Sequence, residues 1–311
     1  MAGLNRSSLA HFVDDSRRGQ LLLVGAFGLA VLLLVLAGVL NTVSYTESLA
    51  TRDADLHDGR DVATFQEDTR RTVRRVVSRV NANESMTVDA KKTTVERTTA
   101  GWSDAVGRHH APDLTGASVT VLDVRGGDRI TQESAGAFVS ADREANWTLA
   151  TNVSESRRFR LRIDRSSLAS DRCDNASCFE LVANGTADTW RLTVNRTAVV
   201  VDGPDSGGTC PVDSDPVRIN VTAGTVGGEE CGALAFAGGP SSYRIEYRNG
   251  SNAVGTYRVT VRGDAETANL NADAAPSYDP LVYDVAVRVT YRTPELHYET
   301  ELRVTGGEPD G

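Results

Sequence analysis

The longest feature of the hydrophobic pattern is an unbroken apolar run near the start of the chain. From Leu21 to Leu40 there are twenty residues without a charge or a proline. A helix rises about 1.5 Å per residue, so this run would span roughly 30 Å, the hydrocarbon thickness of a bilayer. A helix is required there because lipid offers backbone groups no other hydrogen-bond partners. The pattern predicts a transmembrane helix over residues 20–42.

The charges on either side of this run predict its orientation. Arg6, Arg17 and Arg18 precede it, whereas residues 41–58 contain one arginine and four acidic residues. Basic residues close to a span stay on the cytoplasmic side. We therefore expect a cytosolic leader over residues 1–19 and a single-pass cell-membrane protein whose C-terminal domain is extracellular. A cleaved secretory signal peptide is the alternative, although its apolar core would be only about 7–15 residues long.

Beyond the span, the apolar residues recur with a helical period. The first set, at spacings of mostly three and four, is Val62, Phe65, Val73, Val76, Val77 and Val80. The second set, at spacings of seven, seven and four, is Val88, Val95, Trp102 and Val106. These spacings predict one helix from Asn41 to about Val80 and another from Thr87 to His109. Residues 43–110 would form an extracellular helical stalk, either as an antiparallel pair or packed on the domain that follows.

From about Leu114 the period changes to two, which is the period of a half-buried strand. The alternating segments are 118–124, 159–163, 190–194, 217–221, 243–247, 257–261, 282–291 and 298–304. Turn residues at Arg125-Gly126-Gly127-Asp128 and Arg248-Asn249-Gly250-Ser251 are expected to interrupt them. Clean alternation is typical of antiparallel sheets with one solvated face. The predicted fold class is α+β, with a β-rich, mostly antiparallel, sandwich-like head domain over residues 111–311.

The balance of acidic and basic residues argues against one class of binding partner, nucleic acids. The chain has 42 acidic residues against 33 basic ones, and Lys91 and Lys92 are its two lysines. A nucleic-acid surface would need clustered positive charge, so we expect no nucleic acid as a partner. The acidic, lysine-poor composition resembles that of proteins from halophilic archaea.

The end of the leader carries a recognisable pattern. Arg17, Arg18, Gly19 and Gln20 stand directly before the apolar run. This arrangement resembles the class III signal peptide of archaeal type IV pilins and archaellins. The resemblance implies cleavage between Gly19 and Gln20 by a prepilin peptidase, with other pilin-like subunits as partners beside the lipid bilayer. Many pilins place a glutamate among the first mature residues, where this chain has Gly25. A plain N-terminal anchor is the alternative.

Eight asparagines beyond the span open an N-x-Ser/Thr sequence, out of 14 asparagines in the chain. They are Asn83, Asn146, Asn152, Asn175, Asn184, Asn195, Asn220 and Asn249. If about a fifth of all positions were Ser or Thr, about three such sequons would be expected by composition. The excess predicts an N-glycosylated surface protein, unless a threonine-rich chain collects sequons by accident.

The four cysteines all follow the predicted span. Two disulfides are expected in an oxidising compartment, and four cysteines allow three pairings. We favour Cys173–Cys178 with Cys210–Cys231, because each pair brackets a loop rich in Asn, Asp or Gly. A zinc site with four thiolate ligands is the alternative, although the twenty residues inside the second pair exceed the usual knuckle spacing.

Catalysis has little support in the sequence. None of the G-x-S-x-G, H-E-x-x-H or P-loop motifs is present. Of the five histidines, His297 is the one candidate base in the predicted head. Adjacent histidines such as His109-His110 diverge on a helix and chelate poorly. We expect no catalytic site, no metal site and no cofactor.

Three functions compete. The first is a pilin-like, membrane-anchored surface glycoprotein, as a minor subunit or accessory protein of a type IV pilus-like system. The second is a permanently anchored extracellular binding or envelope protein with no filament role. The third, a surface hydrolase, has the weakest support because it would need a catalytic site that no motif indicates.

Overall fold

The computed structural model describes residues 59–111, 115–170, 173, 177–186, 188–204, 207–234, 242–271 and 274–306. The leader and the transmembrane helix expected over residues 20–42 lie outside these ranges. Inside them, no helix is both long enough and apolar enough to cross a membrane. The chain divides into two compact units, Met1–Phe65 and Gln66–Gly311, and the second contains every strand described below.

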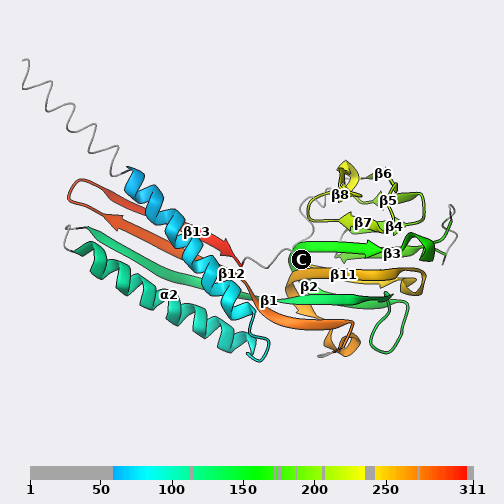
Figure 1. Ribbon diagram of the computed structural model, residues 1–311, viewed down its shortest axis with the longest axis horizontal. Helices are drawn as coiled ribbons and strands as arrows, with labels where there is room; N and C mark the ends of the chain where they lie inside the picture. Colours follow the sequence, from blue (N-terminus) through cyan, green and yellow to red (C-terminus); the bar gives the residue numbers. More distant parts are fainter. Residues whose placement is uncertain are drawn as a thin grey trace, which may run out of the picture. The chain divides into compact units, whose positions relative to one another are not determined.

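An antiparallel sheet is the main element of the unit Gln66–Gly311 (Figure 1). Its described strands are β1 (Gly116–Ala137), β2 (Trp147–Ile163), β3 (Phe179–Gly185), β4 (Thr189–Val194), β5 (Ala198–Asp202), β6 (Gly207–Pro211), β7 (Val217–Asn220), β8 (Thr225–Val226), β9 (Glu229–Glu230), β10 (Tyr243–Arg248), β11 (Val254–Ala265), β12 (Ser277–Arg292) and β13 (His297–Thr305). Their order is β13-β12-β1-β11-β2-β10-β3-β4-β5-β6, with β7, β8 and β9 branching from β2. The antiparallel, β-rich class expected from the alternating pattern is confirmed.

Strand β2 is the point where the sheet divides. One edge of β2 pairs with β11, whereas its other edge changes partner along its length. Residues 147–153 pair with β10, and residues 160–163 pair with β7. The sheet therefore continues beyond β2 in two branches, β10-β3-β4-β5-β6 and β7-β8-β9. This gives a β-sandwich-like arrangement.

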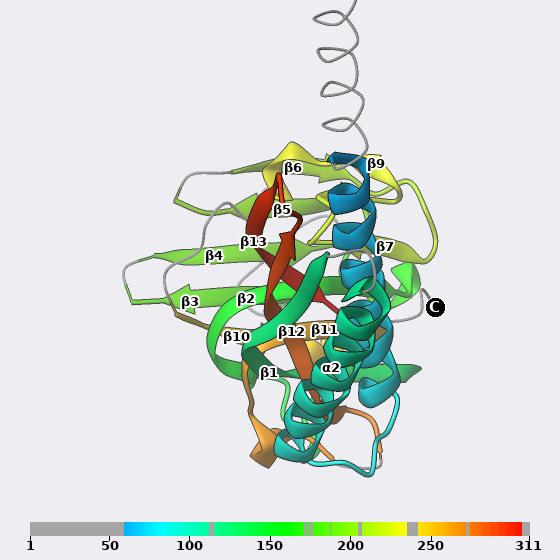
Figure 2. The same ribbon diagram turned by 90° about the vertical axis from the view of Figure 1, so that its left-hand side faces the viewer.

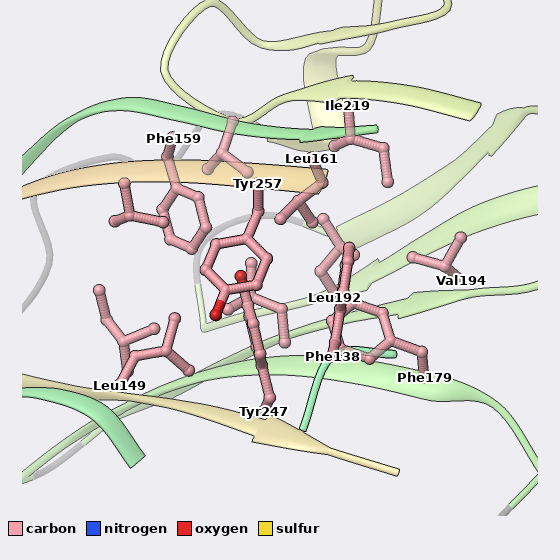
Figure 3. Close-up of a cluster of buried hydrophobic side chains, with 14 of the residues drawn as sticks. Phe138, Leu149, Phe159, Leu161, Phe179, Leu192, Val194, Ile219, Tyr247 and Tyr257 are labelled. Atoms are coloured by element: carbon pink, nitrogen blue, oxygen red, sulfur yellow. The ribbon is translucent and has the colours of Figure 1, made fainter. Parts of the chain in front are cut away.

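A cluster of aromatic rings lies at the centre of the buried core (Figure 3). Phe138 stacks on Tyr247 with ring centroids 5.6 Å apart, and Phe179 meets both rings edge-on. Tyr257 closes the group at 5.2 Å from Tyr247. Such pairs add about 0.5–1.5 kcal/mol each to the effect of burial itself. Burial also raises the pKa of the Tyr247 and Tyr257 hydroxyls, so both phenols stay neutral.

Two helices precede the sheet, one over residues 59–81 and α2 over Val88–His110. The Thr87 side chain accepts a hydrogen bond from the Ala90 N–H and so caps the start of α2. The second predicted helix is confirmed to within one residue at each end. The first ends within about a residue of the predicted Val80, and its predicted start lies outside the described residues.

Within the unit Gln66–Gly311, both helices pack on the part of the sheet formed by β1, β12 and β13 (Figure 2). Asn81, buried at the end of the first helix, exchanges two 2.9 Å hydrogen bonds with the backbone of Val282 on β12. Lys91 of α2 is fully buried, and its Nζ donates to the Pro280 carbonyl at 2.6 Å and to Asp279 at 3.2 Å. Residues 66–110, expected in a stalk, thus share one compact unit with the sheet.

The turn expected at Arg125-Gly126-Gly127-Asp128 is wrong, because β1 runs straight through it. The strand keeps its pairing with β12 there, with one register shift between Arg125 and Gly126. A Cβ on Gly127 would lie 2.2 Å from the Val261 carbonyl oxygen, and a Cβ on Gly126 would lie 3.1 Å from Val88 of α2. The two glycines therefore permit close packing of β11 and α2 on β1 rather than a reversal of the chain.

Candidate functional site

The disulfide between Cys210 and Cys231 joins the ends of the two branches. Cys210 lies in β6, the last strand of one branch, and Cys231 follows directly after β9, the last strand of the other. Their Cα atoms are 5.9 Å apart, and Cys231 is buried in the core cluster. The bond therefore fastens together two parts of the sheet that diverge at β2.

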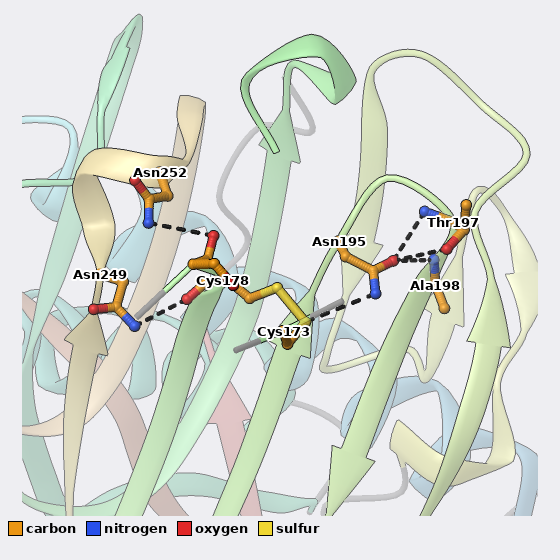
Figure 4. Close-up of a disulfide and its surroundings, with 8 residues drawn as sticks. Cys173, Cys178, Asn195, Thr197, Ala198, Asn249 and Asn252 are labelled. Carbon is orange, nitrogen blue, oxygen red and sulfur yellow. Dashed lines mark hydrogen bonds between the residues drawn. A yellow bond between two sulfur atoms is a disulfide. The ribbon is translucent and has the colours of Figure 1, made fainter. Parts of the chain in front are cut away.

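The second disulfide, between Cys173 and Cys178, lies beside the turn from β10 to β11 (Figure 4). Asn249 donates from Nδ2 to the Cys178 carbonyl at 3.0 Å, and Asn252 donates to the Ser177 carbonyl at 3.3 Å. Asn249 has a positive φ of 52°, a conformation that asparagine tolerates better than most residues. The structure thus joins the cysteines in the local pairing favoured from the sequence. All four sulfurs are used in disulfides, which leaves no thiolate for the alternative zinc site.

Asn195 has a structural use that competes with glycosylation. Its side chain is only 6% exposed. Its Oδ1 accepts hydrogen bonds from the Thr197 N–H, the Thr197 hydroxyl and the Ala198 N–H, at 2.7–3.0 Å (Figure 4). Its Nδ2 points to the Cys173 sulfur at 3.7 Å. Since a glycan is attached through Nδ2, the folded chain has no room for one at this asparagine.

The remaining sequons differ in exposure. Asn83, Asn146 and Asn152 are exposed, whereas Asn184, Asn220 and Asn249 are half-buried. Asn175 lies outside the described residues, as do the processing-site residues Arg17, Arg18, Gly19 and Gln20. Asn83 is exposed and lies in a preformed turn, because its Oδ1 accepts from the Ser85 N–H and hydroxyl. Surface position therefore separates sequons that the sequence pattern treats as equivalent.

The candidate base His297 is exposed at the start of β13, directly opposite Arg292 on β12. In the part of the chain that the structure describes, no three His, Cys, Asp or Glu side chains come together as metal ligands would.

A groove of about 670 Å³ lies over β2, β7 and β11, and we call it the arginine groove. Its charged and polar lining is formed by Arg160, Arg162, Arg218, Arg258, Gln132, Glu133, Asn220, Thr225 and Thr256. Leu161 and Ile219 point to the opposite side of the sheet, into the core. The turn between β8 and β9 borders the groove, and its Gly227 N–H donates to the Arg218 carbonyl at 2.7 Å. Strand pairing, rather than sequence proximity, assembles this lining.

The register of the strands places arginines opposite one another. Arg162 on β2 faces Arg218 on β7, and Arg160 on β2 faces Arg258 on β11. Directly opposed side chains have Cβ atoms about 4.5–5.5 Å apart, and like charges in such pairs are destabilising. The groove contains four arginines and one glutamate, a formal charge of +3, in a chain whose net charge is −9. The groove is thus a positive site on an acidic protein.

Sequence reasoning missed this groove. Its arginines occupy polar positions of three alternating segments that were correctly predicted as strands. Arginine recurs at those positions in 159–163, 217–221 and 257–261. This recurrence was the one feature of the sequence that could have indicated the groove. The pairing of β2 with both β7 and β11, which brings the segments together, is not encoded in the alternation.

The N-terminal third of the chain resembles a known sequence family. Residues 15–125 match the model of a family of unknown function, DUF7261. This stretch contains the end of the expected leader, the apolar run, both helices described above and β1 as far as Arg125. Neither the comparison with curated proteins nor that with solved structures gave a match. The arginine groove and both disulfides lie beyond the matched residues, so what they do must be derived from their own chemistry.

Proposed function

We propose that the protein is a pilin-like, single-pass membrane-anchored cell-surface protein with a cytoplasmic N-terminus and an extracellular β-rich head. The observation that carries the proposal is the pair of disulfides in the chain beyond the apolar run. Disulfides form and persist in oxidising surroundings and are rare in the cytosol. An oxidised head joined to a cytosolic leader requires a membrane between them, and Leu21–Leu40 has the length to cross it.

The arrangement of the head supports the pilin-like part of the proposal. A helix that follows the expected anchor in the chain packs on an antiparallel sheet, through Asn81 and the buried Val73 and Val77. A helix leading from the membrane into a β-rich head is the plan of type IV pilins. Prepilin peptidase would cut after Gly19, and the mature protein would act as a minor subunit or accessory protein of a pilus-like system.

A second candidate is a permanently anchored envelope protein that binds a ligand and has no filament role. The arginine groove favours it, because a positive groove on an acidic protein is suited to binding rather than to packing. Gly25 also stands where many pilins place the glutamate used for subunit registration. In both candidates the role is structural or binding rather than catalytic.

Surface proteolysis tests the shared topology. Protease added to intact cells should remove a C-terminal epitope tag and leave an N-terminal tag protected. Alkylation under non-reducing, denaturing conditions should label no cysteine. A C-terminal tag that becomes sensitive only after lysis would show that the head faces the cytoplasm and would overturn the proposal.

A further inference from the structure

The arginine groove contains positive charge that the described residues do not neutralise. Arg258 donates to Glu133 at 2.8 Å and forms an ion pair with it within the lining. Neither the Arg162 nor the Arg218 guanidinium has a hydrogen-bond or ion-pair partner among the residues that the structure describes, and both residues are exposed. Two opposed arginines without a counter-ion repel each other, and an anion bound between them would relieve that repulsion.

The geometry points to carboxylates as the ligand groups. A guanidinium is a planar fork of N–H donors that matches a carboxylate in two parallel hydrogen bonds. Arg162 and Arg218 stand side by side on neighbouring strands, so a ligand with carboxylates on successive units could pair with both. Asn220, Thr225 and Thr256 lie among the arginines and supply donors and acceptors for hydroxyl groups. We propose that the arginine groove binds an acidic carbohydrate, a chain of uronic-acid sugars whose carboxylates pair with Arg162 and Arg218.

The surroundings of the groove favour a carbohydrate over an acidic peptide. An extended peptide binds by adding a strand to a free sheet edge or by placing apolar side chains in pockets. At residues 160–163, β2 is paired with β11 on one side and β7 on the other, so no free edge is available there. The apolar lining residues Leu161, Ile219 and Tyr257 are at most 3% exposed, so none of these three side chains forms an open pocket for an apolar peptide side chain. A volume of about 670 Å³ is within the range of small-ligand sites.

This inference does not depend on membrane anchoring or on filament assembly. Every residue of the groove belongs to the unit Gln66–Gly311. A negative result in the ligand-binding experiment would therefore not contradict the proposed membrane topology. A negative result in the proteolysis experiment would not contradict ligand binding in the groove.

Calorimetric titration of the full-length protein in detergent tests the proposal, with trigalacturonate as the probe. We expect one trigalacturonate per chain in 0.5 M KCl, and at least tenfold weaker binding of neutral maltotriose. The double variant Arg162→Gln/Arg218→Gln should weaken trigalacturonate binding at least about tenfold, because charge-assisted hydrogen bonds are lost. Raising KCl to 2 M should also weaken binding, since the screening length shortens to about 3 Å or less.

The matched control is Arg244→Gln/Arg292→Gln, which removes the same charge from exposed positions on β10 and β12, outside the groove. It should bind trigalacturonate within about twofold of wild type, and thermal unfolding should show that both double variants fold. The proposal would be overturned if wild type did not bind trigalacturonate, or if the groove variant bound it as tightly as wild type. It would also be overturned if the control variant lost as much affinity as the groove variant. Tighter, arginine-dependent binding of hexaglutamate would assign the groove to an acidic protein segment instead.

Discussion

Removal of the Cys210–Cys231 disulfide should destabilise the head more than removal of Cys173–Cys178. The first bond spans a sequence separation of 21 residues and the second spans 5. In the chain-entropy model, constraint of the unfolded chain is worth about 3.3 kcal/mol for the longer loop and about 2 kcal/mol for the shorter. The Cys210–Cys231 bond also connects the last strands of the two branches, β6 and β9, so its loss frees the ends of both branches.

Thermal unfolding of two double variants, Cys210→Ala/Cys231→Ala and Cys173→Ala/Cys178→Ala, measures the difference. For a unit of this size each kcal/mol corresponds to about 2–4 °C, so we expect the Tm to fall by about 7–13 °C and about 4–8 °C respectively. Alanine is chosen because Cys231 and Cys178 are buried, where a serine hydroxyl would add its own penalty. An equal or larger fall for the Cys173–Cys178 variant would refute the reasoning that loop length and the joined branches set the effect.

Three further predictions concern single polar side chains. Asp284 is 1% exposed and accepts from Nε and Nη2 of Arg125, so Asp284→Asn should lower the free energy of unfolding by about 3–5 kcal/mol in a urea titration; a loss below about 1 kcal/mol would contradict this. Asn195→Gln should change the intact mass of the glycoprotein only by the mass of the substitution and should lower the free energy of unfolding by about 1–3 kcal/mol. Asn83→Gln should instead remove a glycan and leave the free energy of unfolding unchanged. A glycan found at Asn195 would refute the structural role of that side chain. Burial raises the pKa of Asp128, so the folded state keeps this proton to higher pH than the unfolded chain and loses stability as the pH rises above the carboxyl's ordinary range. Asp128→Asn should therefore unfold at a higher temperature than wild type near pH 7 and lose that advantage near pH 3; an advantage that persists near pH 3 would exclude this cause.

Helix α2 and eight of the described strands could be predicted from the sequence. All eight alternating segments coincide with strands, the segment 217–221 extending one residue beyond β7, because one buried and one solvated face impose a period of two. Strand β3 was missed because Leu181, Val182 and Ala183 are buried consecutively and give no alternation. Strand β6 was missed because it reads GGTCP, which has the composition of a turn.

What escaped prediction depends on contacts between distant residues. Gly126 and Gly127 looked like a turn, but they serve the close approach of α2 and β11, which no local pattern reports. The burial of Lys91 was not predicted, since its partners Asp279 and Pro280 come almost two hundred residues later. The arginine groove likewise depends on the register that sets Arg162 opposite Arg218. The spacing of apolar residues along the chain predicts the type of an element, but it does not predict which elements pack beside it.

Mass spectrometry of the mature N-terminus is the most direct test of the pilin-like assignment. We predict a mature protein that begins at Gln20, because Gly19 stands at the predicted cut and Leu21–Leu40 remains as the anchor. A Gly19→Val variant should retain a precursor about nineteen residues longer, still inserted with its head outside, because insertion depends on the apolar run and on Arg17 and Arg18. A mature chain that begins at Met1 or Ala2, with identical gel mobility for wild type and variant, would contradict processing by a prepilin peptidase.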